Sequence, residues 1–352
     1  MKATFPYLGY DTIALSNFLN ALGAEVLLPP PTTERTLSIG TKYSPELICL
    51  PFKITLGNFI EALAAGADTL FMAAGARKCR FGYYHYLQEK ILKNFGNNFQ
   101  FYAISQYTPF EFIFKKMPSI FSVSPQQVLY AIFLLLNHCA LIEDFRKLIR
   151  RARVNNFSKS LVKEKQALQI ISRVKTIKEI HSARKAIKEL FGDTQAVPNG
   201  TIKVGLVGEI YLMLEDFANH DIEKELGRLG VLVLNPRSLY RHLKHLLHID
   251  FSDLKYYYYG RRYLKESPGG EAMNSVGEAY SFIKRGVDGI IHIFPFTCMP
   301  ENIASSALQK LSDDYSIPLL SLSIDEHTSK TGLLTRLEAF VDLLKRKRIK
   351  NN

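Results

Sequence analysis

The chain has 352 residues, of which 47% are hydrophobic and 22% are charged, so it is long enough for two globular domains with cores of their own. Its net charge is +12, and one segment, from Arg146 to Lys188, accounts for all of it with 14 Lys and Arg against Glu164 and Glu179. Such a segment suits nucleic acid, a phosphorylated ligand or an acidic partner, or it is a solvated helical face. Because no nucleic-acid-binding fold is evident, we expect no nucleic-acid partner.

Membrane insertion and secretion are not indicated. The longest apolar stretch, residues 128–142, is interrupted by Asn137 and His138 and falls short of the roughly 18 residues of a membrane span. We therefore expect a buried helix there and no membrane partner. The N-terminus lacks a basic region followed by a long apolar stretch, so no signal peptide is predicted. Four cysteines in a chain of this size do not indicate a disulfide scaffold, which leaves metal binding, catalysis or burial.

Short apolar segments alternate with helical patterns in the first part of the chain. Strands are predicted at residues 2–9, 24–31, 46–53, 68–75 and 99–105. Helical patterns lie between them, one ending at Gly23 and one running from residue 55 to Gly66. Strands that alternate with helices of roughly 10 to 15 residues form parallel βαβ units.

The strand pattern stops near residue 108 and resumes at residue 196. Further strands are predicted at residues 202–208, 231–235, 287–296 and 317–325, with helices at 218–230, 270–286, 300–315 and 331–347. The intervening residues have helical periodicity and contain the basic segment. The predicted fold class is therefore α/β, with two Rossmann-like parallel-sheet domains, residues 1–107 and 196–352, and a basic helical insertion between them at residues 108–195.

Three of the four cysteines accompany predicted strands, and ligands bind beyond the carboxyl ends of strands in parallel sheets. Cys49 ends the apolar part of the strand 46–53, Cys79 follows the strand 68–75, and Cys298 follows the strand 287–296. If the two α/β domains face each other, these cysteines could converge in the cleft, where three thiolates suit an iron–sulfur cluster with one open iron. The alternative is independent buried or loop cysteines, because no CxxC is present. Cys139 lies within an apolar helix and is expected in the core.

Five segments carry a family resemblance. They are ICLPFKITLGNFIEALAAGAD (48–68), GARKCRFGYY (75–84), GEIYLMLEDFANHDIEKELGRLG (208–230), FPFTCMPENIAS (294–305) and DEHTSKTGLLTRLEAFVDLL (325–344). Together they resemble the 2-hydroxyacyl-CoA dehydratase and benzoyl-CoA reductase subunit family. The likeness is closest to its acyl-CoA dehydratase activase-related branch, and it is weakest in the helical insertion.

The resemblance implies a [4Fe–4S] cluster held by three cysteines, which here are Cys49, Cys79 and Cys298. It implies an enzyme, either a 2-hydroxyacyl-CoA dehydratase-like lyase or an ATP-dependent reductase component, that uses an open cluster iron on an acyl-CoA. A separate ATP-hydrolysing activase would supply the low-potential electron, since this chain has no GxxxxGK[ST] phosphate loop. A homo- or heterodimer in the cytoplasm of an anaerobe is also implied.

Three further residues are candidates for catalysis. Lys53 follows Cys49 by four residues, so its ammonium group could offset the negative charge of a cluster, although it could equally be a surface lysine. Glu209 follows the strand 202–208 and is a candidate general acid or base, or a helix cap. His327 stands in the sequence Asp-Glu-His at the end of the strand 317–325, which suits proton transfer or part of a zinc site. Glu301 begins a helix after Pro300, where the helix dipole accounts for a carboxylate.

The leading hypothesis is thus an iron–sulfur protein that performs low-potential electron transfer or reductive chemistry with a partner activase. The alternative is a non-catalytic subunit or scaffold that docks the activase through the basic helical insertion. That alternative predicts that charge reversal at Arg146, Lys147, Arg150 and Arg151 abolishes the complex and leaves metal content intact.

Overall fold

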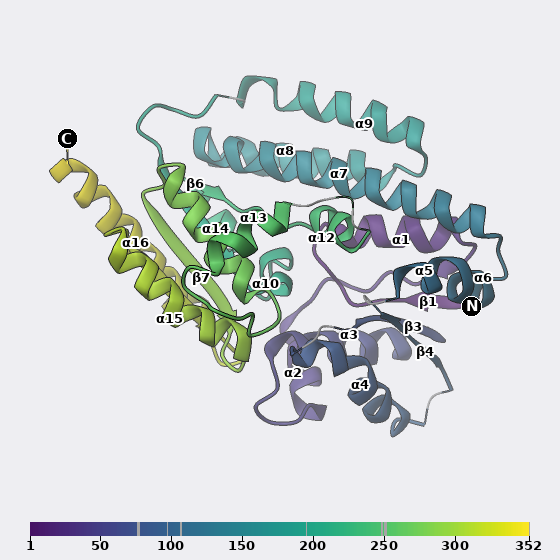
Figure 1. Cartoon of the computed structure of the whole chain (residues 1–352). Helices are drawn as coiled ribbons and strands as arrows, with labels where there is room; N and C mark the ends of the chain where they lie inside the picture. The colour runs from purple at the N-terminus through teal and green to yellow at the C-terminus, as the bar shows by residue number, and fades with distance from the viewer. Residues whose placement is uncertain are drawn as a thin grey trace. The chain divides into compact units, whose positions relative to one another are not determined.

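The computed structural model describes residues 1–75, 78–96, 98–105, 108–194, 196–247, 249 and 252–351. It divides into two compact units, residues 1–139 with 239–250, and residues 140–238 with 251–352. Each unit holds a four-stranded sheet in which every pair of neighbouring strands is parallel (Figure 1). The predicted α/β fold class with two parallel sheets is confirmed. The division passes through the predicted insertion 108–195, whose boundaries stay a prediction.

The first unit is built on a sheet with strand order β2-β1-β3-β4. Its strands are β1 (Lys2–Thr4), β2 (Glu25–Val26), β3 (Thr69–Ala74) and β4 (Gln100–Ser105). The helices α1 (Asp11–Ala21), α3 (Leu50–Ala64) and α4 (Tyr84–Lys93) lie between these strands in the chain. Ala3 pairs with Thr69 and Leu70 pairs with Phe101, which fixes the register of the central strands.

The strand predicted at residues 46–53 is wrong, because α3 begins within it at Leu50. Cys49 is the N-cap residue of this helix and Pro51 stands in its first turn, a position that proline favours because its missing N–H would have no helical partner. Leu47 has a φ of 49° and turns the chain into the helix. A short apolar run cannot be assigned to a strand or a buried helix by periodicity alone.

A helix that the sequence patterns did not reveal, α2 (Glu34–Tyr43), packs against α3. Thr33 caps α2, since its side chain accepts from the N–H of Thr36 while the Thr36 hydroxyl bonds back to the N–H of Thr33. The two helices approach closely at Gly40 and Gly57. A Cβ at Gly57 would lie 2.1 Å from the carbonyl oxygen of Thr36, and a Cβ at Gly40 would lie 1.8 Å from that of Lys53. Glycine is required at both positions, and the contact supports the first turns of α3.

The stretch predicted to be helical is helical. It comprises α5 (Pro109–Glu111), a π-helical turn (Phe112–Lys116), α6 (Met117–Phe121), α7 (Pro125–Asn155), α8 (Phe157–Ser172), α9 (Ile177–Leu190) and a 3₁₀ turn (Gly192–Thr194). By length and composition α7 could cross a membrane, with a mean hydropathy of 1.6 over 18 residues, but half of that window is buried in the structure and a core helix passes the same test. Cys139 is 1% exposed on α7, as predicted.

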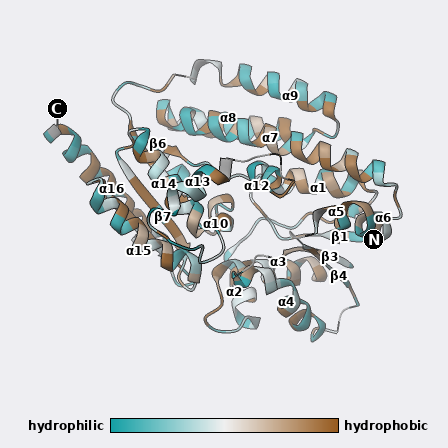
Figure 2. Ribbon diagram, in the orientation of Figure 1, coloured by the Kyte–Doolittle hydropathy of each residue, from teal (hydrophilic) through white to brown (hydrophobic). Residues whose placement is uncertain are grey.

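The second unit is built on a sheet with strand order β6-β5-β7-β8. Its strands are β5 (Ile202–Gly208), β6 (Val231–Leu234), β7 (Gly289–Pro295) and β8 (Leu319–Ile324). All seven residues of β7 are buried, and Figure 2 shows much of this strand in the brown of hydrophobic residues. Buried strands of this kind are typical of parallel sheets with helices on both faces.

The helices of the second unit that come after β5 in the chain follow the order expected of βαβ units. They are α10 (Ile210–Leu214), α11 (Ile222–Arg228), α13 (Ser252–Gly260), α14 (Ala272–Lys284), α15 (Met299–Asp314) and α16 (Lys330–Asn351). Val276 of α14, Ile290 of β7 and Leu308 of α15 belong to one apolar core cluster. The helix α12 (Leu239–Leu246) belongs to the first unit.

Candidate functional site

Cys49 and Cys79 both lie at the carboxyl end of the first sheet. In a parallel unit the helix that precedes a strand begins at the carboxyl end of that strand. Cys49 caps the beginning of α3, the helix before β3, while Cys79 follows β3 and precedes a 3₁₀ turn (Arg80–Tyr83). Cys49 is 7% exposed and Cys79 is half-buried, and both are thiols.

Contacts within the first unit join the two cysteine loops. The Arg80 guanidinium donates to the carbonyl oxygen of Leu47 at 2.9 Å, which ties the residue after Cys79 to the loop before Cys49. The N–H of Gly75 donates to the carbonyl oxygen of Gly82 at 3.4 Å and closes the loop that holds Cys79. Cys49 itself packs in the core cluster of α3. The structure therefore brings the two loops together; a site shared by the two thiols stays a prediction.

Lys53 is buried, with 5% of its surface exposed, so it is not a surface lysine. It lies on α3 one helical turn after Cys49. A buried ammonium group is costly unless a negative charge or hydrogen-bond acceptors face it. This placement suits a lysine that offsets negative charge near the beginning of α3; the catalytic role of Lys53 stays a prediction.

Cys298 caps the beginning of α15 in the second unit, directly after β7, where the sequence predicted it. Its N–H donates to the carbonyl oxygen of Pro295 at 2.8 Å, and the Asn302 side chain donates to the carbonyl oxygens of Phe296 and Cys298 at 3.0 and 2.8 Å. These bonds hold residues 295–298 in a tight turn. Only 5% of Cys298 is exposed, so its thiol is less accessible to solvent than the thiol of an exposed loop residue would be.

The predicted three-cysteine set takes ligands from both units and stays a prediction. Within either unit, no three His, Cys, Asp or Glu side chains of the described residues form a group that could hold a metal ion. The donors themselves fit the cluster in kind, because thiolates are the ligands that iron–sulfur clusters select, and the first unit already brings two thiol-bearing loops together.

Glu209 lies at the carboxyl end of β5, as expected, and caps α10. Its carboxylate accepts from the N–H groups of Tyr211 and Leu212 at 3.1 and 3.0 Å, and its own N–H donates to the carbonyl oxygen of Ile293. The pKa of Glu209 is raised from 4.5 to about 7, chiefly by burial and to a smaller extent by the charge on Glu301, while the two N–H donors and Arg237 oppose the rise. Both readings of Glu209 from the sequence are thus compatible with its position, and its catalytic role stays a prediction.

A buried polar cluster adjoins Glu209 in the second unit. Arg237, which follows β6, donates to Glu278 at 3.0 Å and to Ser275 at 3.3 Å, and also pairs with Glu271. Ser275 donates to Glu301 at 3.0 Å, and the other oxygen of Glu301 lies 2.9 Å from Nε2 of His292. We call these six residues the edge cluster: Arg237, Glu271, Ser275, Glu278, His292 and Glu301.

Sequence reasoning missed most of the edge cluster. Glu301 was attributed to the helix dipole, but it is 1% exposed and bonded to Ser275 and His292. His292 is fully buried in β7, a strand that is otherwise apolar, and one polar residue inside such a run was the signal available. Arg237 and Glu278 are also buried, and neither stands in a motif.

His327 is exposed in the loop between β8 and α16. The Asp325 carboxylate accepts from the N–H of His327 at 3.0 Å and from the Thr328 hydroxyl at 2.8 Å, and the Thr328 hydroxyl accepts from the N–H of Asp325. These bonds form a compact turn before the last helix. The proposed catalytic role of the His327 imidazole stays a prediction.

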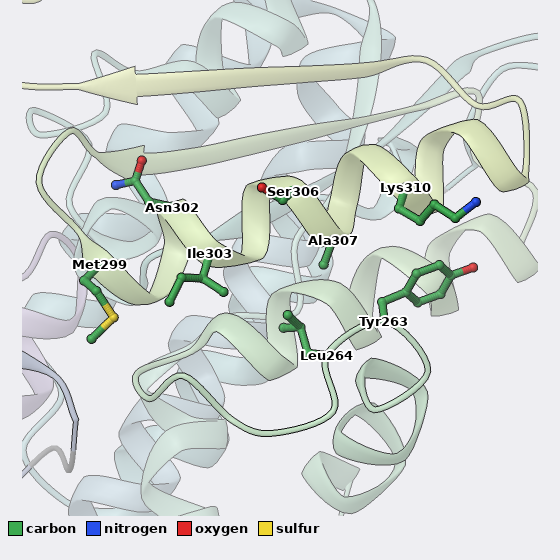
Figure 3. A pocket seen from close by; sticks show the side chains of 8 residues that line it. All are labelled: Tyr263, Leu264, Met299, Asn302, Ile303, Ser306, Ala307 and Lys310. Carbon is green, nitrogen blue, oxygen red and sulfur yellow. The ribbon is translucent and has the colours of Figure 1, made fainter.

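An open pocket of about 570 Å³ runs along α15 from the residue after Cys298 (Figure 3). Leu264, Ile303 and Ala307 give it an apolar middle. Met299 lies at one end, and Tyr263 and Lys310 stand together at the other. The Lys310 ammonium group pairs with Asp314 at 2.7 Å. An elongated ligand with an apolar part and a polar end suits this lining.

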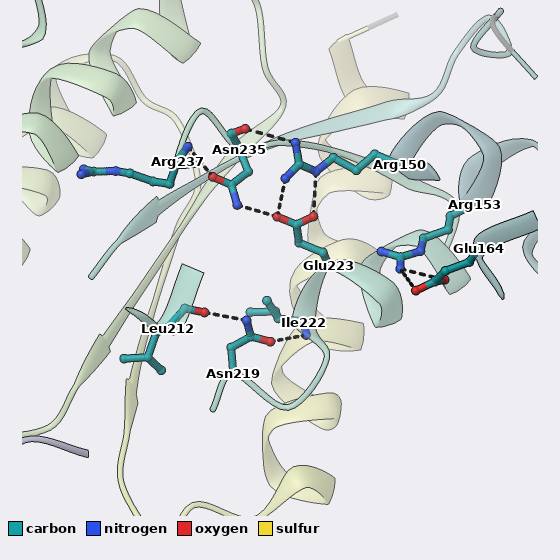
Figure 4. A network of polar contacts seen from close by, with 9 residues as sticks. All are labelled: Arg150, Arg153, Glu164, Leu212, Asn219, Ile222, Glu223, Asn235 and Arg237. Carbon is teal, nitrogen blue, oxygen red and sulfur yellow. Dashed lines mark hydrogen bonds and ion pairs between the residues drawn. The ribbon is translucent and has the colours of Figure 1, made fainter. Parts of the chain in front are cut away.

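The basic segment is divided between the core and the surface. Arg150 makes two bonds to Glu223, at 2.7 and 3.0 Å, and one to the carbonyl oxygen of Asn235, and Arg153 pairs with Glu164 (Figure 4). Arg146, Arg150 and Arg153 are less than 9% exposed. Nine others are exposed: Lys147, Arg151, Lys159, Lys165, Arg173, Lys175, Lys178, Lys185 and Lys188. Arg146 and Arg150 therefore belong to the interior, so they cannot serve as docking residues as the alternative hypothesis assumed.

Comparison with known proteins gives one match. Residues 8–74 match the family model described as "CoA enzyme activase uncharacterised domain". The match contains Cys49 and Lys53 and ends at the last residue of β3. A search of curated proteins found no match. The chain is thus linked to the activase-related family, whereas the resemblance to a dehydratase subunit belongs to the proposal that follows.

Proposed function

We propose that the chain is a [4Fe–4S] protein of the 2-hydroxyacyl-CoA dehydratase and reductase type, with Cys49, Cys79 and Cys298 as cluster ligands. The observation that carries the proposal is the joining of the Cys49 and Cys79 loops through the Arg80–Leu47 hydrogen bond. The activase-related match, which includes Cys49, supports it. A cluster bound by three thiolates would supply low-potential electrons and one open iron.

Residues of the chain would keep water away from such a cluster and would adjust its reduction potential. Cys49 and Cys298 are almost fully buried, and a dry environment strengthens electrostatic interactions. Positive charge near cluster sulfurs raises the reduction potential. Lys53, one helical turn from Cys49, is the residue we assign to this role, with Glu209 and His327 as the groups that move protons.

The proposal includes partners. A separate ATP-hydrolysing activase would donate the electron, and the chain would act in the cytoplasm as a homo- or heterodimer on an acyl-CoA. The apolar middle of the pocket along α15 and the ammonium group of Lys310 at its end suit the acyl and polar parts of such a thioester.

Electron paramagnetic resonance of anaerobically prepared, dithionite-reduced protein tests the assignment. The wild-type chain should give the signal of a reduced [4Fe–4S] cluster, and Cys79→Ala should lose or alter it. Cys139→Ala is the matched control, because Cys139 is buried on α7 and is assigned no ligand role. A wild-type chain that binds zinc to full occupancy and no iron would exclude the proposal.

A second candidate function, docking of the activase without catalysis, is favoured by the nine exposed basic side chains of the segment 146–188. Because Arg146 and Arg150 are buried, the test uses exposed positions. The combined Lys147→Glu, Arg151→Glu, Lys185→Glu and Lys188→Glu variant should lose co-elution with the activase on gel filtration and keep its iron content. Co-elution that survives these changes would remove this candidate.

A further inference from the structure

Four tyrosines of the second unit form a continuous row of contacting rings. Tyr258 and Tyr259 lie in the last turn of α13, Tyr280 lies on α14, and Tyr315 directly follows α15. The ring centroids of successive members are 6.2, 4.8 and 5.7 Å apart. Aromatic side chains that interact have centroid separations of roughly 4.5–7 Å, so each ring contacts the next. We call Tyr258, Tyr259, Tyr280 and Tyr315 the tyrosine row.

Close packing of two helices holds the tyrosine row in place. A Cβ at Gly277 of α14 would lie 2.0 Å from the carbonyl oxygen of Tyr256, and a Cβ at Gly260 of α13 would lie 2.5 Å from a carbonyl oxygen of α14. The two glycines therefore let α13 and α14 approach closely enough for the Tyr259 ring to meet the Tyr280 ring. The positions of these rings are thus fixed by the packing of the backbone.

Positive charges accompany the tyrosine row. The ammonium group of Lys284 lies 5.5 and 5.3 Å from the centroids of the last two rings, and that of Lys255 lies 5.6 Å from the centroid of the second. Arg261 and Arg262 directly follow α13, and both are exposed. In the part of the chain that the structure describes, no carboxylate forms an ion pair with any of these four basic groups. The row therefore carries positive charge that is not neutralised, and such a surface attracts anions.

The tyrosine row adjoins the pocket along α15. Tyr263 and Lys310, which stand at one end of this pocket, both donate to the Asp314 carboxylate, at 3.1 and 2.7 Å (Figure 3). Asp314 is the last residue of α15, and Tyr315, the last member of the row, comes directly after it. A ligand that extends from the apolar middle of the pocket past Lys310 would therefore meet the row.

We propose that the tyrosine row is a binding site for an adenosine diphosphate group, which free ADP and CoA both carry. Aromatic rings stack on nucleotide bases, and lysine and arginine side chains bind phosphates. The base stacks on Tyr258, which is 75% exposed, and the phosphates are bound by Lys284 and Arg262. The site itself is independent of a cluster. Only the assignment of CoA as the source of the nucleotide rests on the proposed function.

Isothermal titration calorimetry of the full-length chain tests the proposal, with iron measured in the same sample. ADP and CoA should both bind, and tripolyphosphate, which has no base, should bind about 5- to 150-fold more weakly than ADP, the loss expected for one stacked base. Tyr258→Ala should weaken the binding of ADP by the same factor. Lys284→Glu combined with Arg262→Glu should weaken it by about 10-fold or more. The matched controls, Tyr86→Ala and Lys90→Glu, change an exposed tyrosine and the lysine over its ring on α4 and should leave binding unchanged.

The two nucleotides distinguish the source of the bound group. Tighter binding of CoA than of ADP identifies the nucleotide end of CoA, with the rest of the molecule in the pocket, whereas equal affinities identify a free nucleotide. Three outcomes would overturn the inference: no binding of ADP, tripolyphosphate that binds as tightly as ADP, or variants of the tyrosine row that bind ADP as the wild type does. The titration needs no cluster, so a chain without iron that binds ADP would keep this inference while the proposed function fails.

Discussion

Arg150→Ala should destabilise the chain strongly, although Arg150 lies within a segment whose sequence suggests a basic surface. The guanidinium group makes two short bonds to Glu223 and a third, of 3.2 Å, to the carbonyl oxygen of Asn235 (Figure 4). The side chains of Arg150 and Glu223 are 9% and 15% exposed. Removing one partner of such a pair leaves a buried charge, which costs about 3–5 kcal/mol. Since proteins of ordinary stability unfold at about 5–15 kcal/mol, the loss should be large but measurable.

Urea unfolding followed by circular dichroism measures the effect, with Arg151→Ala as the matched control. Arg151 is the next residue on α7 and is exposed, so its replacement should change the free energy of unfolding by about 0.5 kcal/mol or less. The unfolding midpoint of Arg150→Ala should fall well below that of Arg151→Ala at the same dependence on urea. Equal midpoints for the two variants would refute the assignment of Arg150 to the core and restore it as a docking residue.

Two further predictions concern packing and pH. Gly57→Ala should lower the free energy of unfolding by at least about 1–3 kcal/mol, because its Cβ would meet the Thr36 carbonyl oxygen at 2.1 Å. Gly332→Ala on α16, where the added Cβ would point into open space, should be neutral or raise the free energy of unfolding by up to about 1 kcal/mol. Thermal unfolding of the two variants checks this, and similar melting temperatures would contradict it. Burial raises the pKa of Asp216 from 3.8 to about 6. The protonated carboxyl group therefore stabilises the folded chain by about 2–3 kcal/mol. This contribution is fully present below about pH 4 and is lost as the pH rises through 6. Asp216→Asn should therefore gain stability relative to wild type between pH 4 and 7 in urea unfolding, and a constant difference across that range would argue against the raised pKa.

Strands were predictable where an apolar run is flanked by glycine or proline. The runs that became β3, β5 and β7 end at Gly75, Gly208 and Pro295, and each pattern predicted the strand that the structure contains. The run around Cys49 failed because four apolar residues before a proline fit both a strand end and a helix start. Pro51 in the first turn of α3 is the signal that favours the helix.

The cysteines and the edge cluster differ in what the sequence could reveal. Cys49, Cys79 and Cys298 stand beside recognisable strands or helix starts, so their positions at the carboxyl ends of the sheets could be anticipated. Arg237 and Glu278 are joined by a hydrogen bond across 41 positions of the chain, and no local pattern predicts a pair at that separation. For the same reason the burial of Arg150 against Glu223, 73 positions away, could not be read from a count of charges.

The amount of iron and acid-labile sulfide per chain tests the central claim most directly. Anaerobically purified wild-type protein should contain about four of each, as a [4Fe–4S] cluster requires. Cys49→Ala, Cys79→Ala and Cys298→Ala should lose most of both, while Cys139→Ala should keep them. If the three ligand variants retain the iron of the wild type, or if the wild-type chain stays free of iron after reconstitution, these cysteines do not hold a cluster.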